Sequence, residues 1–253
     1  MLTRALVVLA VLLTGCAPEV EDRYTNKLVS CSVNLPQDWR DALAANEVKA
    51  GAEKSVDVVA ASPDGRATVL RTWPETGLVL HAADGRRQQI AASQHDTPHV
   101  IEFDGRTVVF SMTSRSGAGV RFYTWDADTG GEPVRINRER QDPDHYRSSD
   151  GTTSVWAEDH RLYGQRTDWP QPRLVAEIQQ SPNVGRIGGP SVHGDFVSWW
   201  GMDSSYVTDM RSGASVHTSY GYVLRVMGGA LVLFKGKDTA AVPLSELSPL
   251  PAC

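Results

Sequence analysis

The sequence has 253 residues, of which 41% are hydrophobic and 22% are charged, and its formal net charge is −5. This length allows one large domain or two small ones, with ample material for a hydrophobic core. An acidic chain without a long basic run lacks the electrostatic signature of nucleic-acid binding, so we expect no nucleic-acid partner.

The first sixteen residues combine the features of an export signal. Arg4 precedes an unbroken apolar run from Ala5 to Leu13, and the motif Leu13-Thr14-Gly15-Cys16 ends it. A positive charge, a short apolar stretch and a small residue before the cleavage point are typical of such signals, whereas a membrane-spanning helix needs about 20 apolar residues. The motif resembles the lipobox of bacterial lipoproteins. The resemblance implies a signal peptide at residues 1–15 and a diacylglyceryl group on Cys16. The alternatives are an ordinary signal peptide and a buried helix with a chance cysteine.

The segment that follows Cys16 is polar as far as residue 26 and carries Glu19, Glu21, Asp22 and Arg23. We expect residues 16–26 to be the lipidated cysteine and a solvated tether with a reach of about 17 Å, and residues 27–253 to form the folded domain. Two acyl chains anchor a protein firmly. We therefore predict an outward-facing protein that its lipid holds on the bacterial cell membrane.

Two cysteines remain besides Cys16. Cys31 lies near the start of the folded domain, and Cys253 is its last residue. Outside the cytoplasm such a pair is typical of a disulfide. The predicted bridge would hold the two ends of the domain together; two free thiols or a metal-binding pair are the alternatives.

One short helix is expected between Asn34 and Val48. Asn34 and Gln37 have the spacing of a capping box, with a proline in the first turn. One face of the helix would carry the residues Trp39, Ala42 and Leu43. The helix is predicted to pack on the domain as a plug or a flank.

The rest of the domain repeats a glycine-containing turn followed by an apolar strand. The five turns align on Gly65, Gly105, Gly151, Gly194 and Gly229, which are 40, 46, 43 and 35 residues apart. Such turns between β-rich runs are typical of hairpins, and a period of about 40 to 45 residues is typical of propeller blades. We predict an all-β fold, a five-bladed β-propeller, rather than a β-sandwich, whose turns recur about every 8 to 12 residues.

Each period is expected to contain four strands. The second strands are predicted at 67–70, 107–110, 152–156, 196–200 and 230–234, and the third strands at 78–82, 120–125, 161–164, 206–210 and 239–244. Fourth strands are predicted at 88–92, 133–137, 173–178 and 214–218, and the fifth period has none. The strand-like segment Lys27–Val33 is predicted to supply the missing strand, and so to close the ring beside the proposed disulfide.

The turns Ser62-Pro63-Asp64-Gly65-Arg66 and Ala83-Asp84-Gly85-Arg86 resemble the short repeats of TolB-like and WD40-like propellers. The first period carries the resemblance best, because later copies lose the proline and often the arginine. The resemblance implies that the domain that follows the lipid anchor in the chain is a propeller of that kind.

Candidate ligand-binding residues occur in loops that a propeller would place on one face. Links between blades share a face with the links between second and third strands. Here these links and their flanks carry His95, Asp96, His99, Asp142, Asp144, His145, Glu158, Asp159, His160 and Asp203. Imidazole and carboxylate groups suit divalent metals, so one hypothesis is a metal or polar-ligand site. The alternative is a set of solvated loop residues, since turns favour polar side chains. We assign no metal ligand, cofactor or catalytic residue.

Four tryptophans, Trp73, Trp156, Trp199 and Trp200, fall on or just after second strands. Packing between blades is their expected role. Trp199 and Trp200 are neighbours in a predicted strand and would therefore face opposite ways. An exposed platform for sugar binding is the alternative.

The sequence contains no phosphate-binding loop, no zinc-protease helix motif and no nucleophile elbow. Catalytic groups in propellers come from scattered loops, so an enzyme stays open. We predict a lipid-anchored, extracytoplasmic β-propeller that acts as a binding or assembly module of the cell envelope, with an envelope protein, a peptide or a glycan as its partner. The alternatives are a hydrolase or lyase that uses the His–carboxylate face, and a ligand sensor coupled to a membrane partner.

Overall fold

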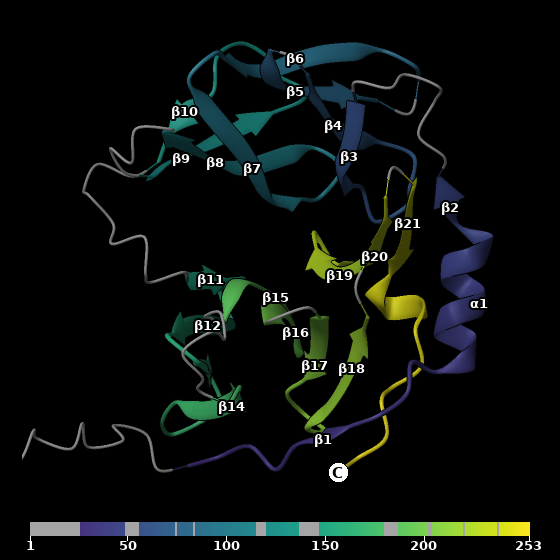
Figure 1. The fold of residues 1–253 in the computed structure, drawn as a ribbon, viewed down its shortest axis with the longest axis vertical. Helices are drawn as coiled ribbons and strands as arrows, with labels where there is room; N and C mark the ends of the chain where they lie inside the picture. Colours follow the sequence, from purple (N-terminus) through teal and green to yellow (C-terminus); the bar gives the residue numbers. More distant parts are fainter. Residues whose placement is uncertain are drawn as a thin grey trace, which may run out of the picture.

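The chain folds into a ring of five β-sheets, which confirms the predicted five-bladed β-propeller (Figure 1). The computed structural model describes residues 26–48, 56–73, 75–82, 84–114, 120–136, 147–179, 187–201, 204–219, 221–236 and 238–253. Within these ranges no helix has the length and apolar character needed to cross a membrane. The predicted lipid site Cys16 lies outside the described residues.

In each blade the first strand lies nearest the centre of the ring, and the later strands follow outward (Figure 1). Blade 1 contains β3 (Val56–Ala61), β4 (Thr68–Thr72), β5 (Thr76–His81) and β6 (Arg87–Ser93). Blade 2 contains β7 (Asp96–Phe103), β8 (Thr107–Ser114), β9 (Val120–Asp126) and β10 (Val134–Arg135). Blade 3 contains β11 (Arg147–Ser149), β12 (Thr153–Glu158), β13 (Arg161–Arg166) and β14 (Arg173–Glu177).

Blade 4 contains β15 (Gly188–His193), β16 (Phe196–Gly201), β17 (Ser204–Asp209) and β18 (Ala214–Thr218). Blade 5 contains β19 (Tyr222–Met227), β20 (Ala230–Lys235) and β21 (Asp238–Pro243). All five aligned glycine turns join a first strand to a second strand, as predicted. The predicted second, third and fourth strands also match observed strands, with shifts of a few residues at their ends.

The local chemistry of the turns explains why they recur. At the second turn, Asp104 Oδ1 accepts hydrogen bonds from the backbone N–H groups of Arg106 (2.8 Å) and Thr107 (2.6 Å). Gly105 takes a φ of +101°, which a residue with a side chain adopts at a steric cost.

The antiparallel order of the strands gives the ring two distinct faces. The turns between first and second strands and those between third and fourth strands lie on one face, the turn face. The opposite face, the link face, carries the links between blades and the turns between second and third strands.

An N-terminal strand closes the ring, but it is a different strand from the one predicted. The outermost strand of blade 5 is β2 (Glu47–Val48), which pairs with β21 in antiparallel register. The predicted closing segment Lys27–Val33 lies elsewhere, so that assignment is wrong. The helix between the two segments carries the chain from blade 4 to blade 5, and only then does it reach the open edge of β21.

Residues 26–33 instead run along the outer edges of blades 3 and 4. Lys27 forms a parallel bridge with Leu174 of β14, and β1 (Cys31–Ser32) pairs in parallel with β18. The predicted disulfide between Cys31 and Cys253 is present, with the two Cα atoms 5.8 Å apart. The bridge therefore fastens the C-terminus to blade 4, rather than to the closing strand of blade 5.

The predicted helix is α1 (Gln37–Ala45), which flanks blade 5 (Figure 1). Its N-cap is Pro36, and no side chain caps it, so the predicted capping box at Asn34 is wrong. Trp39 and Leu43 are buried as expected. The Trp39 indole N–H donates to the carbonyl of Ser248 at 2.9 Å, and this bond ties the helix to the C-terminal segment.

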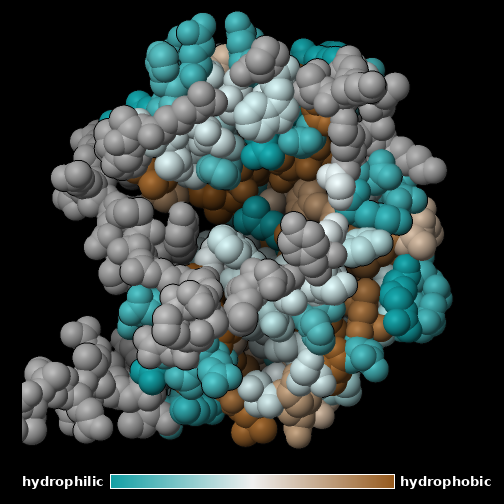
Figure 2. Space-filling model, viewed as in Figure 1, coloured by the Kyte–Doolittle hydropathy of each residue, from teal (hydrophilic) through white to brown (hydrophobic). Residues whose placement is uncertain are grey.

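The core consists of three clusters of buried side chains. The first joins blades 1, 2 and 5, the second joins α1 with blades 4 and 5, and the third joins blades 3 and 4. None of these clusters of described residues spans the junction of blades 2 and 3. Figure 2 shows a hollow near the middle of the visible face, with hydrophobic atoms on its walls and a hydrophilic patch inside it.

Candidate functional site

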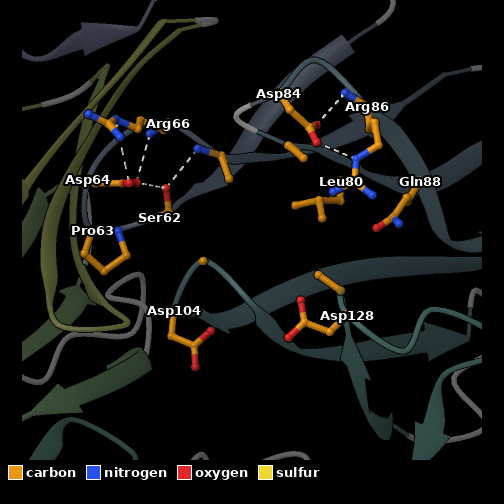
Figure 3. Close-up of a pocket in the computed structure, with 14 residues that line it drawn as sticks. Ser62, Pro63, Asp64, Arg66, Leu80, Asp84, Arg86, Gln88, Asp104 and Asp128 are labelled. Carbon is orange, nitrogen blue, oxygen red and sulfur yellow. Dashed lines mark hydrogen bonds and ion pairs between the residues drawn. The ribbon is translucent and has the colours of Figure 1, made fainter.

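A pocket of about 440 Å³ lies on the turn face between blades 1 and 2 (Figure 3). Two turns from each blade form its walls. Its polar lining includes Ser62, Asp64, Arg66, Asp84, Arg86, Gln88, Asp104 and Asp128. This volume is in the range of small-ligand sites.

Two aspartate–arginine pairs form one side of the pocket (Figure 3). Asp64 accepts hydrogen bonds from the hydroxyl of Ser62 (2.6 Å) and the backbone N–H of Arg66 (3.1 Å). Asp84 accepts from the backbone N–H of Arg86 at 3.0 Å and pairs with its guanidinium at 2.5 Å. These bonds stabilise the charged form of each carboxyl group relative to its neutral form. The Ser62 hydroxyl lowers the pKa of Asp64 most, and the backbone N–H of Arg86 lowers the pKa of Asp84 most.

Asp104 and Asp128 lie on the opposite side, in the turns of blade 2 (Figure 3). Asp104 receives two backbone hydrogen bonds on Oδ1, and no salt bridge between described residues engages its side chain. Asp128 lies 3.1 Å from Nε of Arg106, but that guanidinium also pairs with Asp126 at 2.8 Å. The carboxylates of Asp104 and Asp128 are therefore the less neutralised pair.

The pocket as a whole carries an excess of negative charge. Four aspartates and two arginines line it, and each arginine is paired with the aspartate of its own turn. Among the described lining residues, the hydroxyl is that of Ser62, which donates to Asp64. The described lining thus offers a negatively charged surface.

The structure separates the predicted His–carboxylate residues into smaller groups. Asp96 pairs with Arg121 at 2.5 Å, and His95 is exposed in the link before β7. At the turn between β12 and β13, His160 Nε2 lies 3.6 Å from Glu177, while Asp159 adopts a φ of +51°. Glu158, at the end of β12, accepts a hydrogen bond from the indole of Trp156 at 3.1 Å.

Other members of that predicted set lie outside the described residues, namely Asp142, Asp144, His145 and Asp203. Among the side chains that the structure describes, no three of His, Cys, Asp and Glu form a group suited to a metal ion. A metal or polar-ligand site on the link face therefore stays a prediction.

The tryptophans divide between core and surface. Trp199 is 5% exposed and stacks on Tyr206 with ring centroids 4.1 Å apart, whereas its neighbour Trp200 is 53% exposed. The two face opposite ways, as predicted. Trp73 is 39% exposed, so its expected burial between blades is wrong; it lies in the turn just after β4.

The acidic pocket was not predicted from the sequence, although its residues belong to the turns that revealed the repeat. The signal was present in the Asp-Gly-Arg turns at residues 64–66, 84–86 and 104–106. Two such turns in one blade and their counterparts in the next share the turn face. Only the packing of blades 1 and 2 against each other shows that these three turns and the turn that carries Asp128 enclose one space.

Comparison with known proteins concerns the fold alone. No family model matches the sequence, and no curated protein matches it. Solved structures of similar fold include TolB from Acinetobacter baumannii, with 12% identity and a TM-score of 0.42 over 78% of this chain and 55% of that one. The β-propeller domain of the trilobed protease from Pyrococcus furiosus aligns with 12% identity and a TM-score of 0.45, over 76% of this chain and 79% of that one.

A gluconolactonase from Xanthomonas campestris aligns with 13% identity and a TM-score of 0.41, over 70% of this chain and 68% of that one. This chain spans only about half the length of the A. baumannii TolB that it matches. The likeness to these proteins concerns architecture alone.

Proposed function

We propose that this chain is a lipid-anchored binding module of a bacterial cell envelope, whose turn-face pocket captures a cationic side chain of a partner protein. The pocket between blades 1 and 2 carries the proposal. Its lining carboxylates outnumber its lining guanidiniums by four to two. Complementary charge steers association and selects partners, so a lysine or arginine on an envelope protein or peptide fits this surface.

The rigidity of the pocket also supports binding. Asp64, Asp84 and Asp104 each accept a hydrogen bond from the backbone of their own turn. These bonds hold the carboxylates in place before a partner arrives, so less side-chain entropy is lost on association. The lipobox at Cys16 and the short polar tether support the location, because they would keep the propeller close to the membrane surface.

The proposal is tested with a fluorescent tetralysine peptide and the purified protein, by fluorescence anisotropy at low ionic strength. The double variant Asp104→Asn, Asp128→Asn removes two negative charges, and the asparagine that replaces Asp104 keeps an acceptor oxygen for the backbone of its turn. We expect the affinity to fall roughly tenfold, which corresponds to about 1.4 kcal/mol.

The matched control is Asp168→Asn. Asp168 is exposed, lies in a turn between third and fourth strands in blade 3, and pairs with Arg166 at 2.8 Å. Its replacement should leave peptide binding nearly unchanged. The pocket variant removes two charges and the control removes one, so the two losses of affinity are compared per charge. Equal losses per charge would show that the attraction reflects net charge alone and that the pocket is not the site.

A further inference from the structure

Arg225 reaches from blade 5 to blade 2 near the centre of the ring. It lies on β19, the innermost strand of blade 5, and its Nη1 donates to the carbonyl of Val100 on β7 at 3.1 Å. The side chain is half-buried, and its burial lowers the pKa of the guanidinium to about 10. Arg225 is therefore a charged group that is largely surrounded by protein and keeps part of its surface accessible.

This arginine has no carboxylate partner among the described residues. Three other arginines with limited exposure, Arg71, Arg161 and Arg166, each pair with an aspartate or glutamate. The carbonyl of Val100 uses one of the five N–H donors of Arg225. A buried charge without a counterion is unfavourable, so an anion that pairs with the remaining donors would relieve this penalty.

The surroundings of Arg225 increase the positive potential. His99 precedes Val100 on β7, and its side chain is accessible. Enclosure by the protein lowers the pKa of His99, and the positive charges of Arg71 and Arg225 lower it further. Nε of Arg71 is buried and has no hydrogen-bond partner among the described residues. Arg71 of blade 1, His99 of blade 2 and Arg225 of blade 5 thus lie near one another, and the two arginines carry the positive charge.

Two exposed apolar side chains lie on or just after the strands that carry Arg225 and Arg71. Val223 lies two residues before Arg225, so the two share one side of β19, and Val223 is 42% exposed. Trp73 is 39% exposed, and its indole N–H donates to Asp57 on the innermost strand of blade 1 at 3.2 Å. Its ring also lies 5.2 Å from the guanidinium carbon of Arg71.

We propose that Arg225 and His99 bind the carboxylate of a small molecule whose apolar body lies against Val223 and Trp73. The guanidinium fork matches the two oxygens of a carboxylate. The site goes beyond the proposed capture of a cationic partner and has the opposite charge preference. Because its residues are distinct from those of the turn-face pocket, either proposal can fail without the other.

The test uses benzoate, with the neutral isostere benzamide and inorganic phosphate as comparison probes. Thermal unfolding of the purified protein and the ring signals of His99 in NMR spectra are the two readouts. Benzoate is expected to raise the midpoint of unfolding, shift the His99 signals and raise the pKa of His99, because a negative charge stabilises the imidazolium. Benzamide should do none of these.

The variant Arg225→Met should weaken benzoate binding at least tenfold. The control Arg40→Met removes an equal charge from an exposed position on α1 and should leave binding intact. If Arg225→Met does not fold, Arg225→Lys keeps the charge but lacks the fork, and should still weaken binding about tenfold. The proposal is overturned if benzamide acts like benzoate, if phosphate binds and benzoate does not, or if the Arg225 variants bind benzoate normally.

Discussion

Single residues set how closely the blades approach one another, and Gly228 is the clearest case. Its φ is +54°, and a Cβ atom there would overlap the backbone carbonyl of Phe103 in blade 2. Gly85 also has a positive φ, +84°, but open space surrounds the position of its missing Cβ atom. A comparison of substitutions at these two glycines therefore separates the free-energy cost of backbone strain from that of a steric clash.

We expect Gly85→Ala to lower the free energy of unfolding by about 1–2 kcal/mol, the cost of a left-handed conformation for alanine. Gly228→Ala should lower it by several kcal/mol, roughly the range of the severe core defects, because blades 5 and 2 must also move apart. Urea unfolding of both variants measures the difference. Equal losses of unfolding free energy in the two variants would show that blade 2 shifts at no cost to make room for a side chain at residue 228.

The residue scale also shows what the sequence could reveal about the candidate site. Asp64, Asp84 and Asp104 were visible as turn residues, because the Asp-Gly pattern reports a local hydrogen-bonded conformation. Their convergence on one pocket depends on how blades 1 and 2 pack. Arg225 gave no sequence signal, since a lone arginine in an apolar strand indicates neither its burial nor the absence of a counterion.

At the scale of elements, the hairpins were predicted well and the strand that closes the ring was not. Each hairpin depends on a turn and on two strands in which apolar and polar residues alternate. These features lie within about 20 residues of one another in the sequence. The closing strand β2 has two residues, Glu47 and Val48, which is too short for an alternating pattern. Its pairing with β21 arises because α1 delivers the chain to that edge.

The disulfide belongs to this scale, because it fastens two terminal segments to blade 4. Cys31 and Cys253 are 222 residues apart in sequence. The chain-entropy model gives an upper value of about 5 kcal/mol for such a loop. We expect Cys31→Ser to lower the free energy of unfolding by roughly 2–5 kcal/mol, and to make residues near the C-terminus more sensitive to protease.

Urea unfolding of the oxidised protein, the reduced protein and the variant measures this effect. The reduced protein should match the variant, since both lack the cross-link. An unchanged midpoint after reduction would show that β1 and the contact of Trp39 with Ser248 hold the ends without the bridge. Mass spectrometry of the oxidised sample should map the bond to the same two cysteines.

At the scale of the whole molecule, the packing of the ring is uneven. Described hydrophobic clusters join neighbouring blades at four junctions, whereas none crosses the junction of blades 2 and 3. Hydrogen bonds reinforce the junction of blades 4 and 5, where the backbone N–H of Leu224 donates to the hydroxyl of Ser205 at 2.7 Å.

The predicted anchor also acts on the whole molecule. We expect Cys16→Ser to move the protein from the membrane fraction to the soluble extracytoplasmic fraction, because the thioether-linked acyl chains would be lost. Fractionation and intact mass measure this, with Cys31→Ser as a control that keeps the anchor. Wild-type protein without the diacylglyceryl mass, or a Cys16→Ser variant that stays in the membrane fraction, would contradict the lipobox assignment.

The sequence by itself determined the fold class, the blade period and the hairpin turns, because these depend on interactions local to a turn or a strand. It predicted the pairing of Cys31 with Cys253 on the assumption that Cys16 carries lipid, and the structure shows that bond. Only the tertiary structure decided which N-terminal segment closes the ring, which turns enclose the acidic pocket, and that Arg225 lacks a counterion among the described residues. Each of these depends on distances between residues far apart in the chain, which arise from the packing of blades and helix against one another.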